Sequence, residues 1–198
     1  MSKETYATNG EYYLVRLTEG DRDKYMALKR QVTTSTVYYD DTMLAKIMWE
    51  SAIDGKDKNF SVYNKNDEYC GNVSLQNYDN KTPEIGVNIL EIHRNKGIAG
   101  KVIKLLAKQD YGEQEREHYL LRVSSRNTHS KHMIEKLGAI LIAIEESQYK
   151  TFMRQLQKIA GEEDLRDISE RIKRHFDEDD DKEEEVVYRY KLTPELFM

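Results

Sequence analysis

The chain has 198 residues, of which 38% are hydrophobic, and a formal net charge of −5. That length suits one domain with a buried core, and the negative charge argues against nucleic acid as the main partner. Residues 177–185 hold eight acids and one Lys, so this run carries −7 and the rest of the chain about +2.

The sequence shows no feature of export or membrane insertion. Cys70 is the only cysteine, so no intrachain disulfide can form, and we expect it to fill the core of a strand. The N-terminus is polar, and the longest apolar run, 139–144, is too short to span a bilayer. We therefore expect a cytoplasmic protein with no membrane segment.

The first ninety residues predict a strand, two helices and then three strands. Residues 12–17 are aromatic and branched, as in a strand. Apolar residues at helical spacing follow in 21–32, and again after Asp40 or Asp41. Polar turns then separate three strand-like runs, which predicts an antiparallel meander of 60–63, 71–76 and 84–90.

The turn after the third of these strands is the most informative segment of the chain. Residues 88–100 combine the end of an apolar strand, a basic turn and a glycine-rich helix start. Free backbone N–H groups, the positive end of a helix dipole and the cations Arg94 and Lys96 would converge there. Glycine lets a ligand approach the backbone closely. The segment therefore predicts an anion site, best suited to a pyrophosphate.

The remaining elements complete a mixed sheet. A strand at 119–123 should pair in parallel with 84–90 through a helical crossover. Asn127 is a helix cap, and the helix should end at Gly138. Two further strands are expected at 139–144 and 186–192.

Residues 146–185 do not fit this alternation. They carry two apolar stripes at helical spacing and end in the acidic run. This pattern predicts a helical insertion before the last strand, followed by a solvated acidic tether. We expect the insertion to form a lid or a dimer contact, so a homodimer is possible, and the acids to favour a cationic substrate.

Two motifs together indicate a family. Arg94-x-x-Gly97-x-Ala99 is followed by Asn127-x-x-Ser130 and then by Glu135-Lys136-Leu137-Gly138. The pair resembles the GCN5-related N-acetyltransferase (GNAT) superfamily, and the Asn-x-x-Ser helix start is most similar to the branch of ribosomal-protein N-terminal acetyltransferases. The likeness covers residues 12–145 and resumes at 186–192.

The resemblance implies an α/β (α+β) fold in one domain, residues 1–198, with 146–185 inserted. Its sheet would be mixed, mostly antiparallel, of about seven strands and flanked by helices. It also implies an N-acetyltransferase that passes an acetyl group from acetyl-CoA directly to a primary amine, such as a small amine, a polyamine or a peptide N-terminus.

The resemblance assigns the cofactor contacts to the glycine turn and the capped helix. The pyrophosphate would lie on the turn, and the pantetheine arm would add to the strand edge like an extra strand, which requires residues 88–90 to splay from the parallel neighbour. The residues implied are Ile89, Leu90, Arg94, Asn95, Lys96, Gly97, Ile98, Ala99, Gly100, Asn127 and Ser130.

The catalytic groups are less well defined by the sequence. Glu84 is the candidate base, because it begins the strand that carries the cofactor contacts, and Glu91 is the weaker alternative. Many superfamily members donate a proton from a tyrosine where this chain has Ile134. Ser130, or a tyrosine from the expected substrate segment 33–40, would replace it; the candidates there are Tyr38 and Tyr39.

Two other interpretations stay open. A degenerate CoA-binding sensor or scaffold module would also carry the glycine turn, and the missing tyrosine favours it. His129 and His132 lie three residues apart, but no further ligand stands at a fixed spacing, so we expect them on the surface and predict no metal site.

Overall fold

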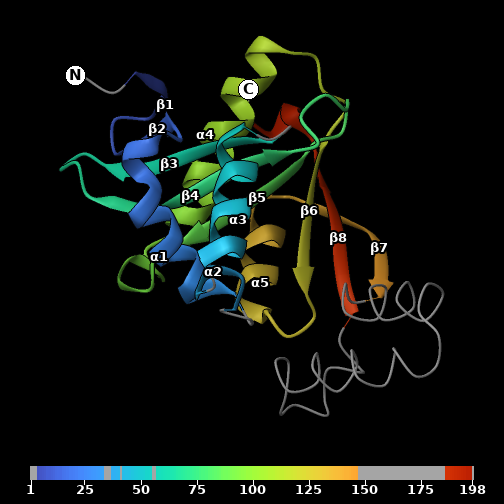
Figure 1. The fold of residues 1–198 in the computed structure, drawn as a ribbon. Coiled ribbons are helices and arrows are strands. Elements are labelled where there is room, and N and C mark those ends of the chain that lie inside the picture. The colour runs from blue at the N-terminus through green and yellow to red at the C-terminus, as the bar shows by residue number, and fades with distance from the viewer. Residues whose placement is uncertain (1–3, 34–36, 41, 55–56, 147–185, 198) are drawn as a thin grey trace, which may run out of the picture.

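The structure, a computed structural model, describes residues 4–33, 37–40, 42–54, 57–146 and 186–197. These residues form one sheet with the strand order β1-β2-β3-β4-β5-β6-β8-β7 (Figure 1). Only β5 and β6 pair in parallel, so the expected mixed and mostly antiparallel sheet is confirmed. The strands are β1 (Thr5–Thr8), β2 (Tyr12–Arg16), β3 (Lys58–Asn64), β4 (Tyr69–Gln76), β5 (Glu84–Ile89), β6 (Tyr119–Ser124), β7 (Ile140–Glu146) and β8 (Val186–Leu192).

The sheet has eight strands rather than the expected seven or so, because β1 escaped prediction. It has four residues, and a register shift between Thr5 and Ala7 interrupts its pairing with β2. A strand this short carries too few residues to show alternation, and it forms because β2 supplies its hydrogen-bonding partner.

Five α-helices are described, together with three short 3₁₀ turns. The helices are α1 (Arg22–Val32), α2 (Val37–Asp40), α3 (Thr42–Asp54), α4 (Ile98–Glu113) and α5 (Thr128–Lys136), and the turns are η1 (Glu19–Asp21), η2 (Glu91–His93) and η4 (Pro194–Phe197). The segment expected to link the first two helices thus contains α2. No described helix is long and apolar enough to cross a membrane. The predicted insertion at 146–185 falls almost wholly on residues 147–185, outside the described residues.

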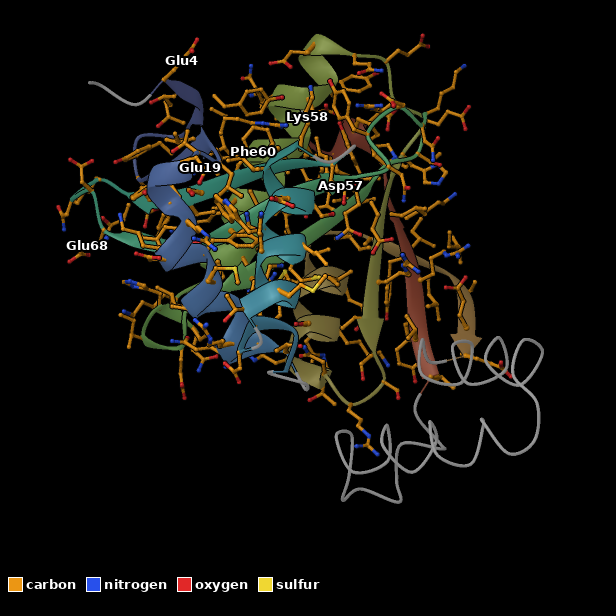
Figure 2. The ribbon with its side chains drawn as sticks, viewed as in Figure 1. Glu4, Glu19, Asp57, Lys58, Phe60 and Glu68 are labelled. Carbon is orange, nitrogen blue, oxygen red and sulfur yellow. The ribbon has the colours of Figure 1, made fainter. Side chains whose placement is uncertain are left out.

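Helices cover the sheet on both faces, and each face has its own core (Figure 1). The larger core packs α4 and Ile134 of α5 against the sheet and includes Cys70, as expected for that residue. The smaller core lies under α1, α2 and α3 and contains Tyr25, Tyr39 and Trp49. Trp49 also donates a hydrogen bond to Glu19 of η1, at 3.1 Å to Oε2, which ties η1 to α3; Figure 2 labels Glu19.

Successive side chains of β5 point alternately towards these two layers. Ile85, Val87 and Ile89 pack in the larger core with α4. Because successive side chains of a strand point to opposite faces, Glu84 and Asn88 face the layer of α1 and α3.

The C-terminal end of α4 is closed by a buried ion pair. Asp110 and Arg116 have fully buried side chains, and Arg116 Nε lies 2.8 Å from Asp110 Oδ2. The Tyr119 hydroxyl donates to the same carboxylate oxygen at 2.9 Å and to the Ala107 carbonyl at 3.0 Å. Burial, and next the Asp110 carboxylate, raise the pKa of Tyr119. This cluster joins the end of α4 to β6 and, through Arg116 and the carbonyl of Tyr78, to the turn between β4 and β5.

Candidate functional site

The parallel strands β5 and β6 separate almost as soon as they meet. They share one residue pair, Glu84 with Leu120, whereas β4 pairs with β5 all the way from Glu84 to Ile89. The edge of β5 that faces β6 therefore has backbone groups without a strand partner, which is the splay that the sequence predicted. Gly71 on β4 makes this path possible, because a Cβ there would overlap the Asn88 carbonyl oxygen.

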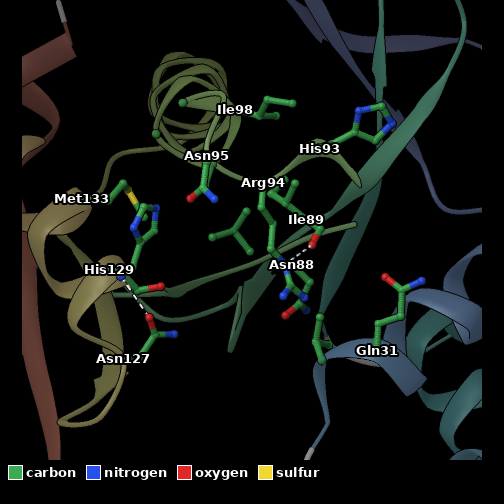
Figure 3. A pocket seen from close by; sticks show the side chains of 16 residues that line it. Gln31, Asn88, Ile89, His93, Arg94, Asn95, Ile98, Asn127, His129 and Met133 are labelled. Atoms are coloured by element: carbon green, nitrogen blue, oxygen red, sulfur yellow. Dashed lines mark hydrogen bonds between the residues drawn. The ribbon is translucent and has the colours of Figure 1, made fainter. Parts of the chain in front are cut away.

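A cavity of about 510 Å³ opens where the two strands separate (Figure 3). Residues from both helical layers and from the glycine turn line it. They are Gln31, Val32, Val87, Asn88, Ile89, His93, Arg94, Asn95, Gly97, Ile98, Ala99, Gly100, Asn127, His129, Ser130 and Met133.

The start of α4 forms one wall of this cavity. Gly97 precedes the first helical residue at φ 73°, a conformation that favours glycine, and it has no side chain to accept a hydrogen bond. The first N–H groups of a helix have no acceptor within the helix. Arg94 lies beside them, with its Nε donating to the Ile89 carbonyl at 3.2 Å. The wall therefore combines free N–H groups, the helix dipole and a cation, as an anion site requires.

The start of α5 forms the facing wall. The Asn127 side chain accepts a hydrogen bond from the Ser130 N–H at 3.0 Å, which confirms the predicted cap. Figure 3 shows Asn127, His129 and Met133 on this wall, with Gln31 reaching the cavity from α1 on the other side. Ser130 lines the cavity as expected.

Two residues predicted to contact the cofactor do not line the cavity. The Leu90 N–H donates to the Cys70 carbonyl at 3.0 Å, so it pairs with β4 rather than facing the opening. Lys96 turns back to its own turn, where Nζ donates to the Ile92 carbonyl at 2.9 Å. The other nine predicted cofactor residues line the cavity.

Glu84, the predicted base, is not brought to the cavity. It stands five residues before Ile89 at the opposite end of β5, roughly 17 Å away at strand spacing. Its Oε2 accepts from Arg122 on β6, at 2.7 Å from Nε and 2.6 Å from Nη2. The ion pair with Arg122 therefore holds Glu84 away from the cavity.

Of the two predicted tyrosines, Tyr39 does not line the cavity. Tyr39 is 7% exposed and packs in the core beneath α1 and α3, and the side chain of Tyr38 lies outside the described residues. Ile134 is buried in the larger core, so the position of the family tyrosine serves packing here.

Several lining residues escaped sequence analysis. Gln31 and Val32 end α1 and reach the cavity only through tertiary packing, so no local pattern marks them. Val87 and Asn88 stand two and one residues before the predicted contacts, and Asn88 already belonged to the segment 88–90 that was expected to splay. His129 is exposed, as expected, and it also lines the cavity beside Ser130, which the sequence did not indicate.

The described residues contain no group of three or more His, Cys, Asp or Glu arranged to hold a metal ion. A second hollow of about 490 Å³ lies at the β1–β3 edge, where Figure 2 labels Glu4, Lys58 and Phe60. Its charges are balanced, since Glu4 and Glu113 face Arg16 and Lys58. The cavity at the start of α4 fits the acyl donor that the family resemblance implies, because it pairs an anion site with a free strand edge.

Comparison with known proteins agrees with this geometry. A family model described as Acetyltransferase (GNAT) domain matches residues 12–140, while no curated protein sequence matches the chain. The fold is similar to a crystal structure of spermidine N-acetyltransferase from Vibrio cholerae in complex with CoA and spermine, with a TM-score of 0.68 and 17% identity over 96% of this chain and 99% of that chain.

A dodecameric structure of spermidine N-acetyltransferase from Vibrio cholerae, in an intermediate state, has a TM-score of 0.66 and 15% identity over 96% of this chain and 98% of that one. At these identities the solved structures establish the fold. None of the comparisons supports the narrower likeness to the ribosomal-protein N-terminal acetyltransferases.

Proposed function

Since the chain belongs to the GNAT acetyltransferase family by its match over residues 12–140, we propose that it transfers an acetyl group from acetyl-CoA to a primary amine. The observation that carries this proposal is the free edge of β5 beside the open start of α4. A CoA molecule needs both features at once, because its pyrophosphate is an anion and its pantetheine arm is an extended chain with amide groups.

In this proposal the cofactor runs along the cavity from α4 towards β6. The N–H groups of Ile98, Ala99 and Gly100, with Arg94, take the pyrophosphate. The edge of β5 at Val87–Ile89, which is separated from β6, takes the pantetheine amides. Asn127 and Ser130 approach from α5 near the thiol. A backbone N–H at the separated part of β5 is then placed to stabilise the oxyanion of the tetrahedral intermediate.

The acceptor amine must lose a proton before it can attack the thioester. Glu84 is poorly suited to this task, since Arg122 holds it away from the cavity. We propose that a histidine of the lining, His129 or His93, accepts the proton instead, since histidine is the commonest general base in enzymes. Ser130, which lines the cavity, would donate a hydrogen bond to the departing thiolate in this proposal.

The candidate acceptors are small amines, polyamines and peptide N-termini. The similar solved structures are named for spermidine acetylation, which makes polyamines the first acceptors to test. The described lining of the cavity contains no Asp or Glu, and we propose that the acidic run 177–185 attracts cationic substrates. A KM for spermidine that does not change with ionic strength would exclude such an attraction.

The first test measures binding and turnover separately. Acetyl-CoA and CoA, but not ATP, should raise the melting temperature, since a ligand at a hundred times its Kd adds about 2.7 kcal/mol of stability. Thiol release should then appear with at least one amine from a panel of spermidine, a monoamine and a peptide with a free N-terminus. No thermal shift with acetyl-CoA would refute the cofactor assignment.

Variants of the two candidate bases separate the mechanisms. His129→Gln should lower kcat by ~10²-fold with CoA binding retained if His129 accepts the proton. Glu84→Gln is the matched comparison, and we expect a smaller loss of kcat. A larger loss in Glu84→Gln than in His129→Gln would return the role to Glu84.

A second candidate function is a catalytically degenerate CoA-binding sensor. Two observations favour it, namely the buried Ile134 at the tyrosine position and the ion pair that holds Glu84. Binding of acetyl-CoA without thiol release for any amine of the panel would support this alternative over the enzyme.

A further inference from the structure

Lys29 places an amine beside the edge of the cavity that lies opposite the glycine turn. Asn88 lines the cavity, and its side chain faces the layer of α1. With its amide oxygen turned towards α1, Asn88 accepts a hydrogen bond from Lys29 Nζ at 3.2 Å, and its nitrogen donates to the Val87 carbonyl at 3.3 Å. The opposite orientation of the amide would set two donors against each other. One side chain thus separates this amine from the cavity.

The surroundings of Lys29 differ from those of the other lysines near the site. Lys101 pairs with Glu11, and Lys96 caps the Ile92 carbonyl. Lys29 instead lies against the Tyr25 ring, with Nζ 5.1 Å from its centre, and no carboxylate of the described residues pairs with it. Burial lowers the pKa of Lys29, so more of this amine is neutral and nucleophilic than of an exposed lysine.

The arrangement of the two layers puts Lys29 where an acceptor would stand. The glycine turn and α5 lie with the larger core, while Gln31 and Val32 bring α1 to the cavity from the other layer. An acyl donor bound along the edge of β5 would enter between α4 and α5, and its thioester would lie in the same cavity that Gln31 and Val32 reach from α1. Lys29 lies on α1 two residues before Gln31, on a flexible four-carbon stem.

We propose that Lys29 is itself an acetyl acceptor, modified by acetyl-CoA bound in this cavity. The proposal rests on the cofactor assignment above. The neutral Nζ attacks the thioester carbonyl carbon, an amide bond forms, and the C–S bond breaks. The proton lost from nitrogen goes to the departing thiolate, so the products are Nζ-acetyl-Lys29 and CoA thiol. The modification removes a positive charge and places an acetyl group at the acceptor side, so it slows the acetylation of free amines.

Peptide mass spectrometry after incubation of the full chain with acetyl-CoA, without any amine, tests the proposal. Lys29 should be acetylated faster than Lys24, an exposed lysine on the same helix, because burial lowers the pKa of Lys29 and its amine lies beside the cavity that binds the acyl donor. Excess CoA should suppress the modification of Lys29 and leave that of Lys24 unchanged. Arg94→Gln should slow it at limiting acetyl-CoA, because the reaction draws on bound cofactor.

The outcomes separate this proposal from the proposed function. Thermal stabilisation by acetyl-CoA together with an unmodified Lys29 would overturn the inference alone. Equal rates at Lys29 and Lys24, or the same pattern in urea-unfolded chain, would also overturn it, since they indicate acetylation in solution. Absence of any binding would overturn both. Lys29→Arg should keep CoA binding and, where turnover is measured, should remove the slow decline in rate during preincubation with acetyl-CoA.

Discussion

The polar groups at the two ends of helix α4 differ in whether the protein itself provides their hydrogen-bond partners. At the start, Gly97 offers no cap to the first N–H groups, and the cation Arg94 lines the cavity. At the end, Asp110, Arg116 and Tyr119 are buried and hydrogen-bonded to one another. A helix end without protein partners is costly unless a ligand or water satisfies it. We therefore propose that the closed end of α4 stabilises the fold and that the open end binds the ligand.

The largest loss of stability should come from disrupting the buried ion pair at the C-terminal end of α4. Asp110→Ala leaves the Arg116 guanidinium buried without its carboxylate, and removal of one partner of a buried pair costs about 3–5 kcal/mol. Urea denaturation should show this loss in the free energy of unfolding. Glu50→Ala, which removes the exposed partner of Lys46 on α3, is the control and should change little. A loss of similar size in both variants would contradict the account.

The next largest effect should come from Tyr119→Phe. The change removes a hydroxyl that donates to Asp110 and Ala107, and an acceptor left unpaired in the core costs about 1–3 kcal/mol. The partly exposed Tyr188 is the matched control, and Tyr188→Phe should stay within about 0.5 kcal/mol of the parent chain. An unchanged unfolding midpoint for Tyr119→Phe would show that the cluster tolerates a missing donor.

At the open end, substitutions should weaken binding more than folding. Arg94→Gln should weaken CoA about tenfold, or about 1.4 kcal/mol, because it removes the charge nearest the proposed pyrophosphate. Lys96→Gln should have a smaller effect, since Lys96 turns away to the Ile92 carbonyl. Calorimetric titration with CoA measures both. Equal losses of CoA affinity would mean that Lys96 breaks its hydrogen bond to the Ile92 carbonyl when CoA binds.

Substitution of two glycines, one just before α4 and one near its end, should change the stability in opposite directions. Gly97→Ala forces a side chain into φ 73° and should cost about 1–2 kcal/mol of stability. Gly112 lies within the helix and a Cβ there would meet nothing within 4 Å, so Gly112→Ala should gain up to about 1 kcal/mol. Thermal unfolding of the two variants decides the sign. A gain in Gly97→Ala would show that the turn relaxes out of the left-handed conformation.

The open end could be predicted from sequence because its parts are adjacent in the chain. Arg94, Gly97 and Gly100 lie within seven consecutive residues, and their chemistry follows from the turn and the helix dipole. The predicted cap by Asn127 is equally local. The antiparallel meander and the parallel crossover were also accessible, since alternation and turn residues mark each strand.

The part of the cavity that α1 and Asn88 line could not be predicted from the sequence, because tertiary packing brings these residues together. Gln31 and Asn88 stand far apart in the chain, and they meet only once α1 lies on β5. The prediction that Glu84 serves the cavity was wrong for a related reason, since Glu84 forms an ion pair with Arg122 on the neighbouring strand β6. A strand position shows which face a side chain occupies, but its ion-pair partner comes from another strand.

Gly71 shows how far the sensitivity of the site extends beyond the residues that line it. It lies inside β4 and does not line the cavity, yet any side chain at this position would collide with the Asn88 carbonyl on β5. In a saturation mutagenesis map, position 71 would therefore appear among the most intolerant positions while an inspection of the lining residues would omit it. Even the smallest replacement would displace β5 in the segment that carries both Asn88 and the free strand edge.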